Sequence, residues 1–190
     1  MNSGNAVLVV IDVQNGFITD GSRGVVPVIA DLVQRWQDAG GDVVFTRYIN
    51  YPGSPYERLI KWTKLSDSPE IDIVEELIPY AEKSTAVVDK KVYSLFADQV
   101  GRDLVADRGW TDIYVCGIDT ESCVLKTAVD AFELDLTPWL IKDASASHKG
   151  TTVHDMGVFI TQRFIGQGQI ITVADIPGDL APYRPTLAPD

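Results

Sequence analysis

The sequence predicts an α/β protein, a single domain with three layers (α/β/α) around a doubly wound parallel sheet of six strands. Two patterns support this fold class. Short runs rich in Val, Ile, Leu and aromatic residues alternate with amphipathic stretches, and several of these runs are apolar without alternation, as in strands buried on both faces of a parallel sheet. The length of 190 residues suits one core that folds without disulfides or metals, so we expect one domain over 1–190.

The apolar runs define the predicted strands, and the amphipathic stretches between them define the predicted helices. The strands are Ala6–Ile11, Asp42–Thr46, Thr85–Asp89, Asp112–Cys116, Thr137–Ile141 and Gln169–Val173. The helices are Val26–Ala39, Leu95–Arg108, Ser122–Leu134 and Thr151–Ile165. The first helix illustrates the pattern, because its apolar residues form one stripe and Gly40-Gly41 follows as a stop signal.

Two parts of the chain do not follow this regular alternation. Residues 50–77 form an irregular excursion that opens with several turn-forming residues, and we expect short helices there over Tyr56–Thr63 and Ile71–Tyr80. Residues 177–190 are rich in proline and predict an extended C-terminal arm.

Composition narrows the classes of function. Sixteen basic and 27 acidic residues give a net charge of −11, which argues against partners such as nucleic acid or an anionic membrane surface. Two cysteines are too few for a disulfide framework, and the chain has no signal peptide and no apolar run long enough to span a membrane. We therefore expect a cytoplasmic protein that acts on a small-molecule substrate.

Residues with charged or reactive side chains lie at the predicted strand ends, which is where ligands bind in doubly wound sheets. Asp12, Arg47 and Lys90 each end a strand, and the loop Gly117–Cys123 follows another. Each has a structural alternative. Asp12 could cap the following loop, Lys90 could be a solvated surface residue, and Cys123 could be buried packing.

Together these residues predict nucleophilic chemistry. A thiol, a carboxylate and an ammonium that converge at one crevice are the groups that covalent acyl transfer needs. We expect the helix N-terminus and the ammonium to favour the thiolate of Cys123, with Asp12 as the base. Cys116 lies inside an apolar run and is expected to be inert packing.

Three motifs that contain these residues resemble the signatures of the isochorismatase-like cysteine hydrolases. The motifs are Asp12-x-Gln14-x-x-Phe17, Lys90-x-x-Tyr93-Ser94-x-Phe96 and Gly117-Ile118-x-Thr120-x-x-Cys123. The resemblance extends from about Ala6 to Val173, in the family's order. This superfamily includes nicotinamidases, N-carbamoylsarcosine amidase and ureidoacrylate amidohydrolases, and it implies the same α/β fold and an assembly as a homo-oligomer.

The resemblance also assigns roles to residues. It implies a catalytic triad of Asp12, Lys90 and Cys123, and it selects Lys90 over its neighbour Lys91. It implies a cis peptide bond before Asp119, which would aim the backbone amides of Asp119 and Cys123 at a substrate oxygen as an oxyanion hole. Phe17 and Tyr93 fall where the family builds its pocket walls, with aromatic core packing as the alternative.

The sequence departs from two branches of that family. Nicotinamidases carry an aspartate and histidines after the second strand as metal ligands, but Thr46–Tyr51 contains no histidine, so we expect no metal and no cofactor. His148 and His154 come late in the chain, on a loop and on the last helix. True isochorismatases work without a cysteine nucleophile, so Cys123 argues against that reaction.

The remaining candidates for substrate recognition lie in the excursion over residues 50–77 and at the strand end before it. Arg47 could bind a substrate carboxylate or pair with an acidic neighbour, and Trp62 could belong to a lid or to a subunit interface. The leading hypothesis is a metal-independent hydrolase that cleaves the C–N bond of a small amide or ureide through a thioester. The alternatives are a binding or redox-responsive protein without turnover and, less favoured, a nicotinamidase.

Overall fold

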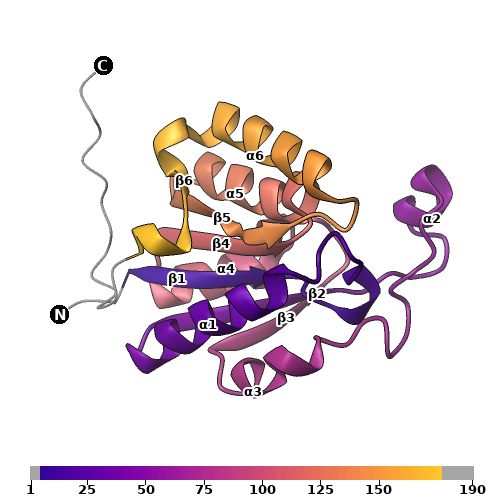
Figure 1. Ribbon diagram of the computed structural model, residues 1–190, viewed down its shortest axis with the longest axis horizontal. Coiled ribbons are helices and arrows are strands. Elements are labelled where there is room, and N and C mark those ends of the chain that lie inside the picture. The colour runs from indigo at the N-terminus through magenta and orange to yellow at the C-terminus, as the bar shows by residue number, and fades with distance from the viewer. Residues whose placement is uncertain (1–4, 177–190) are drawn as a thin grey trace.

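A computed structural model describes residues 5–176, and the predicted C-terminal arm over 177–190 lies outside these residues. Six parallel strands form one sheet in the order β3-β2-β1-β4-β5-β6 (Figure 1). The strands are β1 (Ala6–Ile11), β2 (Asp42–Tyr48), β3 (Ala86–Lys90), β4 (Asp112–Ile118), β5 (Thr137–Ala146) and β6 (Ile170–Ile171). The six-stranded parallel sheet predicted from the sequence is confirmed.

Helices cover both faces of the sheet. They are α1 (Val25–Asp38), α2 (Pro55–Ile60), α3 (Ile78–Ala81), α4 (Gln99–Arg108), α5 (Leu125–Glu133) and α6 (Thr151–Ile165). One core joins α1 and α3 to one face of the sheet, and a second core joins α4, α5 and α6 to the other. Along β1, Leu8 and Val10 enter the first core and Val7 and Val9 the second, because successive strand residues point to opposite faces.

The strand order sets the place of the site. The chain winds outward from β1 to β2 and β3, then returns to β4 on the other side of β1. The direction of winding therefore reverses between β1 and β4, whose carboxyl ends lie side by side because Ile11 pairs with Gly117. In open α/β sheets this switch point is where ligands bind.

Several predicted helices are shorter than the sequence pattern indicated. The segment Ile71–Tyr80 is not one helix: a 3-10 turn over Glu75–Leu77 precedes the four-residue α3. Pro79 lies in the first turn of α3, and its ring would clash with a preceding helical turn, so the helix begins just before it. The predicted helix Leu95–Arg108 divides at Asp98, whose carboxylate caps α4 by accepting from the Gly101 N–H at 3.3 Å.

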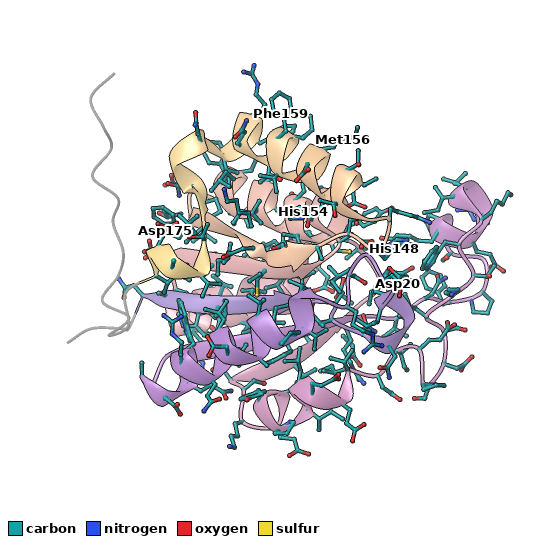
Figure 2. The ribbon with its side chains drawn as sticks, viewed as in Figure 1. Asp20, His148, His154, Met156, Phe159 and Asp175 are labelled. Carbon is teal, nitrogen blue, oxygen red and sulfur yellow. The ribbon has the colours of Figure 1, made fainter. Side chains whose placement is uncertain are left out.

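The excursion between β2 and β3 extends away from the sheet, and α2 stands apart from the main body in Figure 1. This helix ends at Ile60, three residues earlier than the sequence predicted, and the next residue, Lys61, adopts a left-handed φ of 58°. The side chains of Leu59 and Ile60 are 72% and 60% exposed. Met156 and Phe159 are also exposed, and they project outward from α6 (Figure 2).

The remaining differences concern the ends of the sheet. β5 runs five residues past its predicted end, and the predicted strand Gln169–Val173 is reduced to the two residues of β6. Within residues 5–176, no helix combines the length and the apolar character that crossing a membrane requires.

Candidate active site

Asp12 lies at the switch point, directly after β1. Its side chain is fully buried and its φ is 49°, in the left-handed region that residues other than glycine seldom adopt. The backbone N–H of Asp12 donates to the Thr46 carbonyl at 3.2 Å, and the Thr46 hydroxyl donates to Asp12 Oδ1 at 2.6 Å. The carboxylate is therefore held in one orientation by the neighbouring strand β2.

Lys90, the last residue of β3, provides the countercharge. Its Nζ lies 2.5 Å from Asp12 Oδ2, and the exposed fractions of the two side chains are 1% and 0%. The same ammonium donates to the Val92 carbonyl at 3.1 Å. Burial alone would lower the pKa of Lys90, but Asp12 and Cys123 outweigh burial and raise that pKa above its usual value. Lys90 is thus a buried cation.

Cys123 completes the cluster, and its thiol is subject to opposing effects on its pKa. It is only 4% exposed, and burial raises the pKa of its thiol well above the usual value, although the Lys90 ammonium pulls that pKa down. Hydrogen bonding to Asp12 also favours the protonated sulfur. Desolvation of the sulfur thus opposes the thiolate that the sequence analysis expected, and the nearby ammonium favours it.

The turn that carries Cys123 is firmly attached to its surroundings. The peptide bond between Ile118 and Asp119 is cis, and residues Thr120–Val124 form a π-helical turn before α5. The backbone amides of Ser122 and Val124 both donate to the Asp119 carbonyl at 3.1 Å. The Thr120 hydroxyl lies 2.7 Å from Nδ1 of His154, which ties the turn to α6.

Close packing of α6 also fixes this turn. A Cβ built on Gly157 would lie 2.7 Å from the backbone nitrogen of Glu121, closer than any real side chain could remain. Glycine at position 157 therefore lets α6 approach the backbone of the cysteine turn. His154 holds the same turn through its contact with Thr120.

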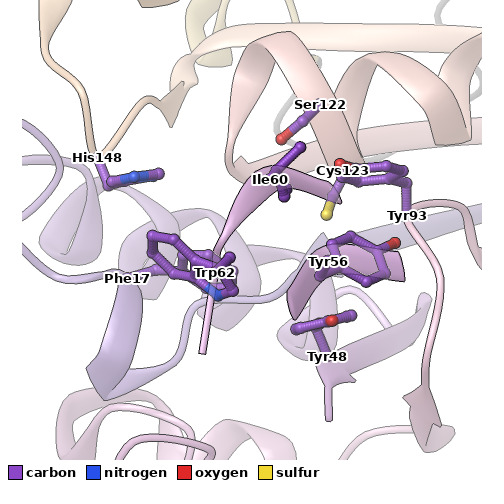
Figure 3. Close-up of a pocket in the computed structure, with 9 residues that line it drawn as sticks. All are labelled: Phe17, Tyr48, Tyr56, Ile60, Trp62, Tyr93, Ser122, Cys123 and His148. Carbon is purple, nitrogen blue, oxygen red and sulfur yellow. The ribbon is translucent and has the colours of Figure 1, made fainter. Parts of the chain in front are cut away.

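A pocket of about 120 Å³ adjoins Cys123. Figure 3 shows the sulfur of Cys123 directed into it. The residues that line it are Phe17, Tyr48, Tyr56, Ile60, Trp62, Tyr93, Ser122, Cys123 and His148. The structure thus brings Phe17, Trp62 and Tyr93 together with Cys123, as the sequence led us to expect.

Most of the pocket wall is aromatic. Phe17 and Trp62 stack with ring centroids 6.0 Å apart and planes 15° from parallel. Tyr56 bridges Tyr48 and Tyr93, with centroid distances of 4.8 and 4.9 Å. These two aromatic clusters lie on either side of the space below the sulfur (Figure 3).

Arg47 does not belong to this pocket. Its Nε and one terminal nitrogen donate to the two carboxylate oxygens of Asp89 at 2.7 and 2.8 Å. Arg47 and Asp89 are directly opposite in the register of β2 and β3, and Arg47 borders a separate hollow lined by Asp72 and Val87. Successive residues of β2 point to opposite faces, so Tyr48 enters the pocket and Arg47 cannot. Of the two roles considered for Arg47, the structure thus favours pairing with an acidic neighbour, Asp89, over binding a substrate carboxylate.

His148 is the polar pocket residue that the sequence analysis did not select. It follows β5, and its backbone N–H and ring Nδ1 lie 2.7 and 2.5 Å from the two carboxylate oxygens of Asp119. Its Nε2 is buried and has no hydrogen-bond partner within the described part of the chain. Only its position after a strand end could have identified it, and the sequence placed that strand end five residues too early.

The residues offer no evident metal site. Within residues 5–176, no group of three or more His, Cys, Asp or Glu side chains is arranged to hold a metal ion. His148 and His154 have separate partners, Asp119 and Thr120.

The doubly wound sheet, with a buried Asp, Lys and Cys at its switch point, defines an α/β protein whose candidate functional site lies at the carboxyl ends of its strands. Residues 6–174 match the family model described as an isochorismatase domain, and the chain belongs to the isochorismatase family.

Curated relatives and solved structures agree with this membership. The chain is 26% identical to the ureidoacrylate amidohydrolase RutB of Azorhizobium caulinodans, over 94% of this chain and 91% of the relative. Nicotinamidase PncA from Bacillus subtilis superposes with a TM-score of 0.77 at 24% identity, over 88% of this chain and 99% of that one. N-carbamoylsarcosine amidase from Thermoplasma acidophilum also gives a TM-score of 0.77, at 22% identity, over 90% and 98%. The chain is thus an isochorismatase-like hydrolase-family member with amidase relatives.

Proposed function

We propose that this protein is a metal-independent cysteine hydrolase that cleaves the C–N bond of a small amide or ureide through a thioester on Cys123. One observation carries the proposal: a carboxylate and an ammonium with no solvent access are held against a cysteine that borders a small pocket. A buried ion pair contributes little net stability, so its retention beside a nucleophile supports a chemical role.

The first half of the reaction forms the acyl enzyme. Asp12 takes the thiol proton as the sulfur of Cys123 attacks the substrate carbonyl, because the resting sulfur is protonated and needs a base. The backbone amides of Asp119 and Cys123 receive the developing oxyanion. Protonated Asp12 then donates its proton to the nitrogen, the C–N bond breaks, and the amine or ammonia leaves a thioester behind.

The second half returns the enzyme to its starting state. Asp12 removes a proton from water, whose oxygen attacks the thioester carbonyl, and the C–S bond breaks as the carboxylic acid forms. The proton returns to the sulfur. Throughout, Lys90 remains charged and stabilises the negative charge that moves between Asp12, the sulfur and the oxyanion.

The family relatives support amide chemistry, since those reported above are an ureidoacrylate amidohydrolase, a nicotinamidase and an N-carbamoylsarcosine amidase. The alternative of a redox-responsive protein needs an accessible thiol with a lowered pKa. Cys123 is only 4% exposed and burial raises the pKa of its thiol, which counts against a redox-responsive role.

Ammonia release from a panel of small amides and ureides tests the proposal. We expect turnover by the wild-type protein, none by Cys123→Ala, and retained turnover by Cys116→Ala, whose thiol is buried in the opposite core. Circular dichroism shows whether each variant is folded. Full activity in folded Cys123→Ala would end the proposal.

A further inference from the structure

The wall around Cys123 lacks a side chain that could neutralise a substrate carboxylate. Among the described residues that line the pocket, six are aromatic or aliphatic side chains besides Cys123, and none is lysine or arginine. The polar side-chain groups among these lining residues are the tyrosine hydroxyls, the indole N–H of Trp62, Ser122 and His148. A substrate therefore meets mainly ring faces and edges on its way to the sulfur.

No lysine or arginine among the described residues lines the pocket, and three of those near this end of the sheet have other partners. Lys90 contacts Asp12 behind the sulfur, and the resulting pair has no net charge. Arg47 is held bidentately by Asp89 beside a different hollow. Lys91, the neighbour of Lys90, lies 5.3 Å from the centre of an aromatic ring that is not part of the pocket wall.

His148 does not supply a net positive charge either. Its ring nitrogen Nδ1 lies against the buried carboxylate of Asp119. If the imidazole is neutral, the pair carries one negative charge; if it is protonated, the pair is neutral. In both states the electrostatic balance at this wall is zero or negative, so it does not favour an anionic ligand.

We propose that the substrates of this pocket are uncharged and largely apolar, and that the pocket excludes amides and ureides that bear a carboxylate. This inference rests on the proposed hydrolase and specifies its substrate class. It separates this chain from a relative such as ureidoacrylate amidohydrolase, whose named substrate is an acid. A carboxylate placed between the two aromatic clusters would be desolvated without a countercharge.

The reaction also fits this charge balance. A neutral amide and water give a carboxylic acid and ammonia, so the uncharged substrate becomes an anion in a pocket that offers it no cation. The product is therefore bound less tightly than the substrate, which favours its release.

The experiment uses a matched pair of primary amides, succinamic acid and its methyl ester, which differ by one methyl group and by the charge at the end remote from the amide. Titration calorimetry on folded Cys123→Ala measures binding without turnover, and ammonia release by the wild-type protein measures kcat/KM. We expect the ester to bind about 100-fold more tightly than the acid and to show a similar advantage in kcat/KM.

Two lysine substitutions on α2 show whether charge is the cause. Ile60 lines the pocket and is 60% exposed, so Ile60→Lys adds an ammonium at the pocket with little cost to folding. We expect it to raise kcat/KM for the acid about tenfold. Leu59 is also exposed but does not line the pocket, so Leu59→Lys is expected to leave both rates unchanged.

The outcomes separate the two proposals. Equal or tighter binding of the acid, or no binding of either compound at about 10 mM, would overturn the inference about substrate charge. Binding of the ester without ammonia release from any amide or ureide would instead count against the hydrolase and leave the charge preference standing. An identical effect of Leu59→Lys and Ile60→Lys would show that long-range charge, and not the pocket wall, sets the preference.

Discussion

Replacing Lys90 with methionine removes the ammonium from the buried cluster and keeps most of the side-chain volume. The structure gives the size of the effect. Nζ lies 2.5 Å from Asp12 Oδ2, neither side chain is more than 1% exposed, and water cannot take the place of the lost charge. Removing one partner of such a pair leaves an uncompensated buried charge, which costs about 3–5 kcal/mol. A bond to the Val92 carbonyl is lost as well.

Urea unfolding followed by circular dichroism measures this cost. We expect Lys90→Met to lower the free energy of unfolding by about 3–5 kcal/mol. Lys91→Met is the matched control: the adjacent side chain is exposed, so the expected change is about 0.5 kcal/mol or less. The double variant Asp12→Asn/Lys90→Met removes both charges and should recover about 2 kcal/mol of the loss.

A loss of less than about 1 kcal/mol in Lys90→Met would refute this reasoning, because it would mean that the pair is screened by solvent. Strict additivity of the two single substitutions would contradict the coupling between Asp12 and Lys90.

Three further predictions concern the cysteine turn, the buried acids and bases, and the strand end outside the pocket. Gly157→Ala should lower kcat at least about tenfold and destabilise the fold by about 1–3 kcal/mol, because the new Cβ displaces the backbone at Glu121. Steady-state kinetics measures the loss in kcat, and urea unfolding measures the loss in stability. Alkaline pH should destabilise the protein, because folding raises the pKa of Cys123 above 9.0 and that of Lys90 above 10.5. The stability that these groups contribute at lower pH is then lost as the pH rises above these values. Melting temperatures measured between pH 8 and 11 would show this loss. Arg47→Met should leave kcat/KM within about twofold and change stability by about 1 kcal/mol or less.

Each of these has a control or a contradicting result. Gly24→Ala adds a Cβ that meets no atom within 4 Å, so it should leave kcat unchanged, and an equal loss in both glycine variants would remove the argument about the turn. Melting temperatures that rise from pH 9 to 11 would contradict the direction of the pKa shifts. A large fall in kcat/KM for Arg47→Met would place this residue at the substrate after all.

The sequence could place the three reactive side chains near one another because parallel strands end at one edge of a sheet. Asp12 and Cys123 follow β1 and β4, Lys90 is the last residue of β3, and the strand order places these three strand ends close together. Their protonation could not be predicted in the same way. The pKa of Cys123 depends on how completely the pocket residues desolvate its sulfur, and that depends on side chains far apart in the chain.

The pocket wall was only partly predictable for a related reason. Phe17 and Tyr93 belong to motifs near the strand ends, whereas Tyr56 and His148 reach the pocket through the path of loops. Loop paths follow from long-range contacts, such as the hold of Asp119 on His148, more than from local residue preferences. Arg47 was ambiguous until the register of β2 against β3 placed Asp89 beside it.

The most direct test of the account is to intercept the acyl enzyme. With a neutral amide that the wild-type protein hydrolyses, rapid quenching and intact-mass analysis should show the mass of the acyl group added to the protein, and peptide mapping should place it on Cys123. Hydroxylamine should divert the same thioester to a hydroxamate. Continued hydrolysis with no acyl group on Cys123 and no hydroxamate would mean that water attacks the substrate directly, and the central claim would be wrong.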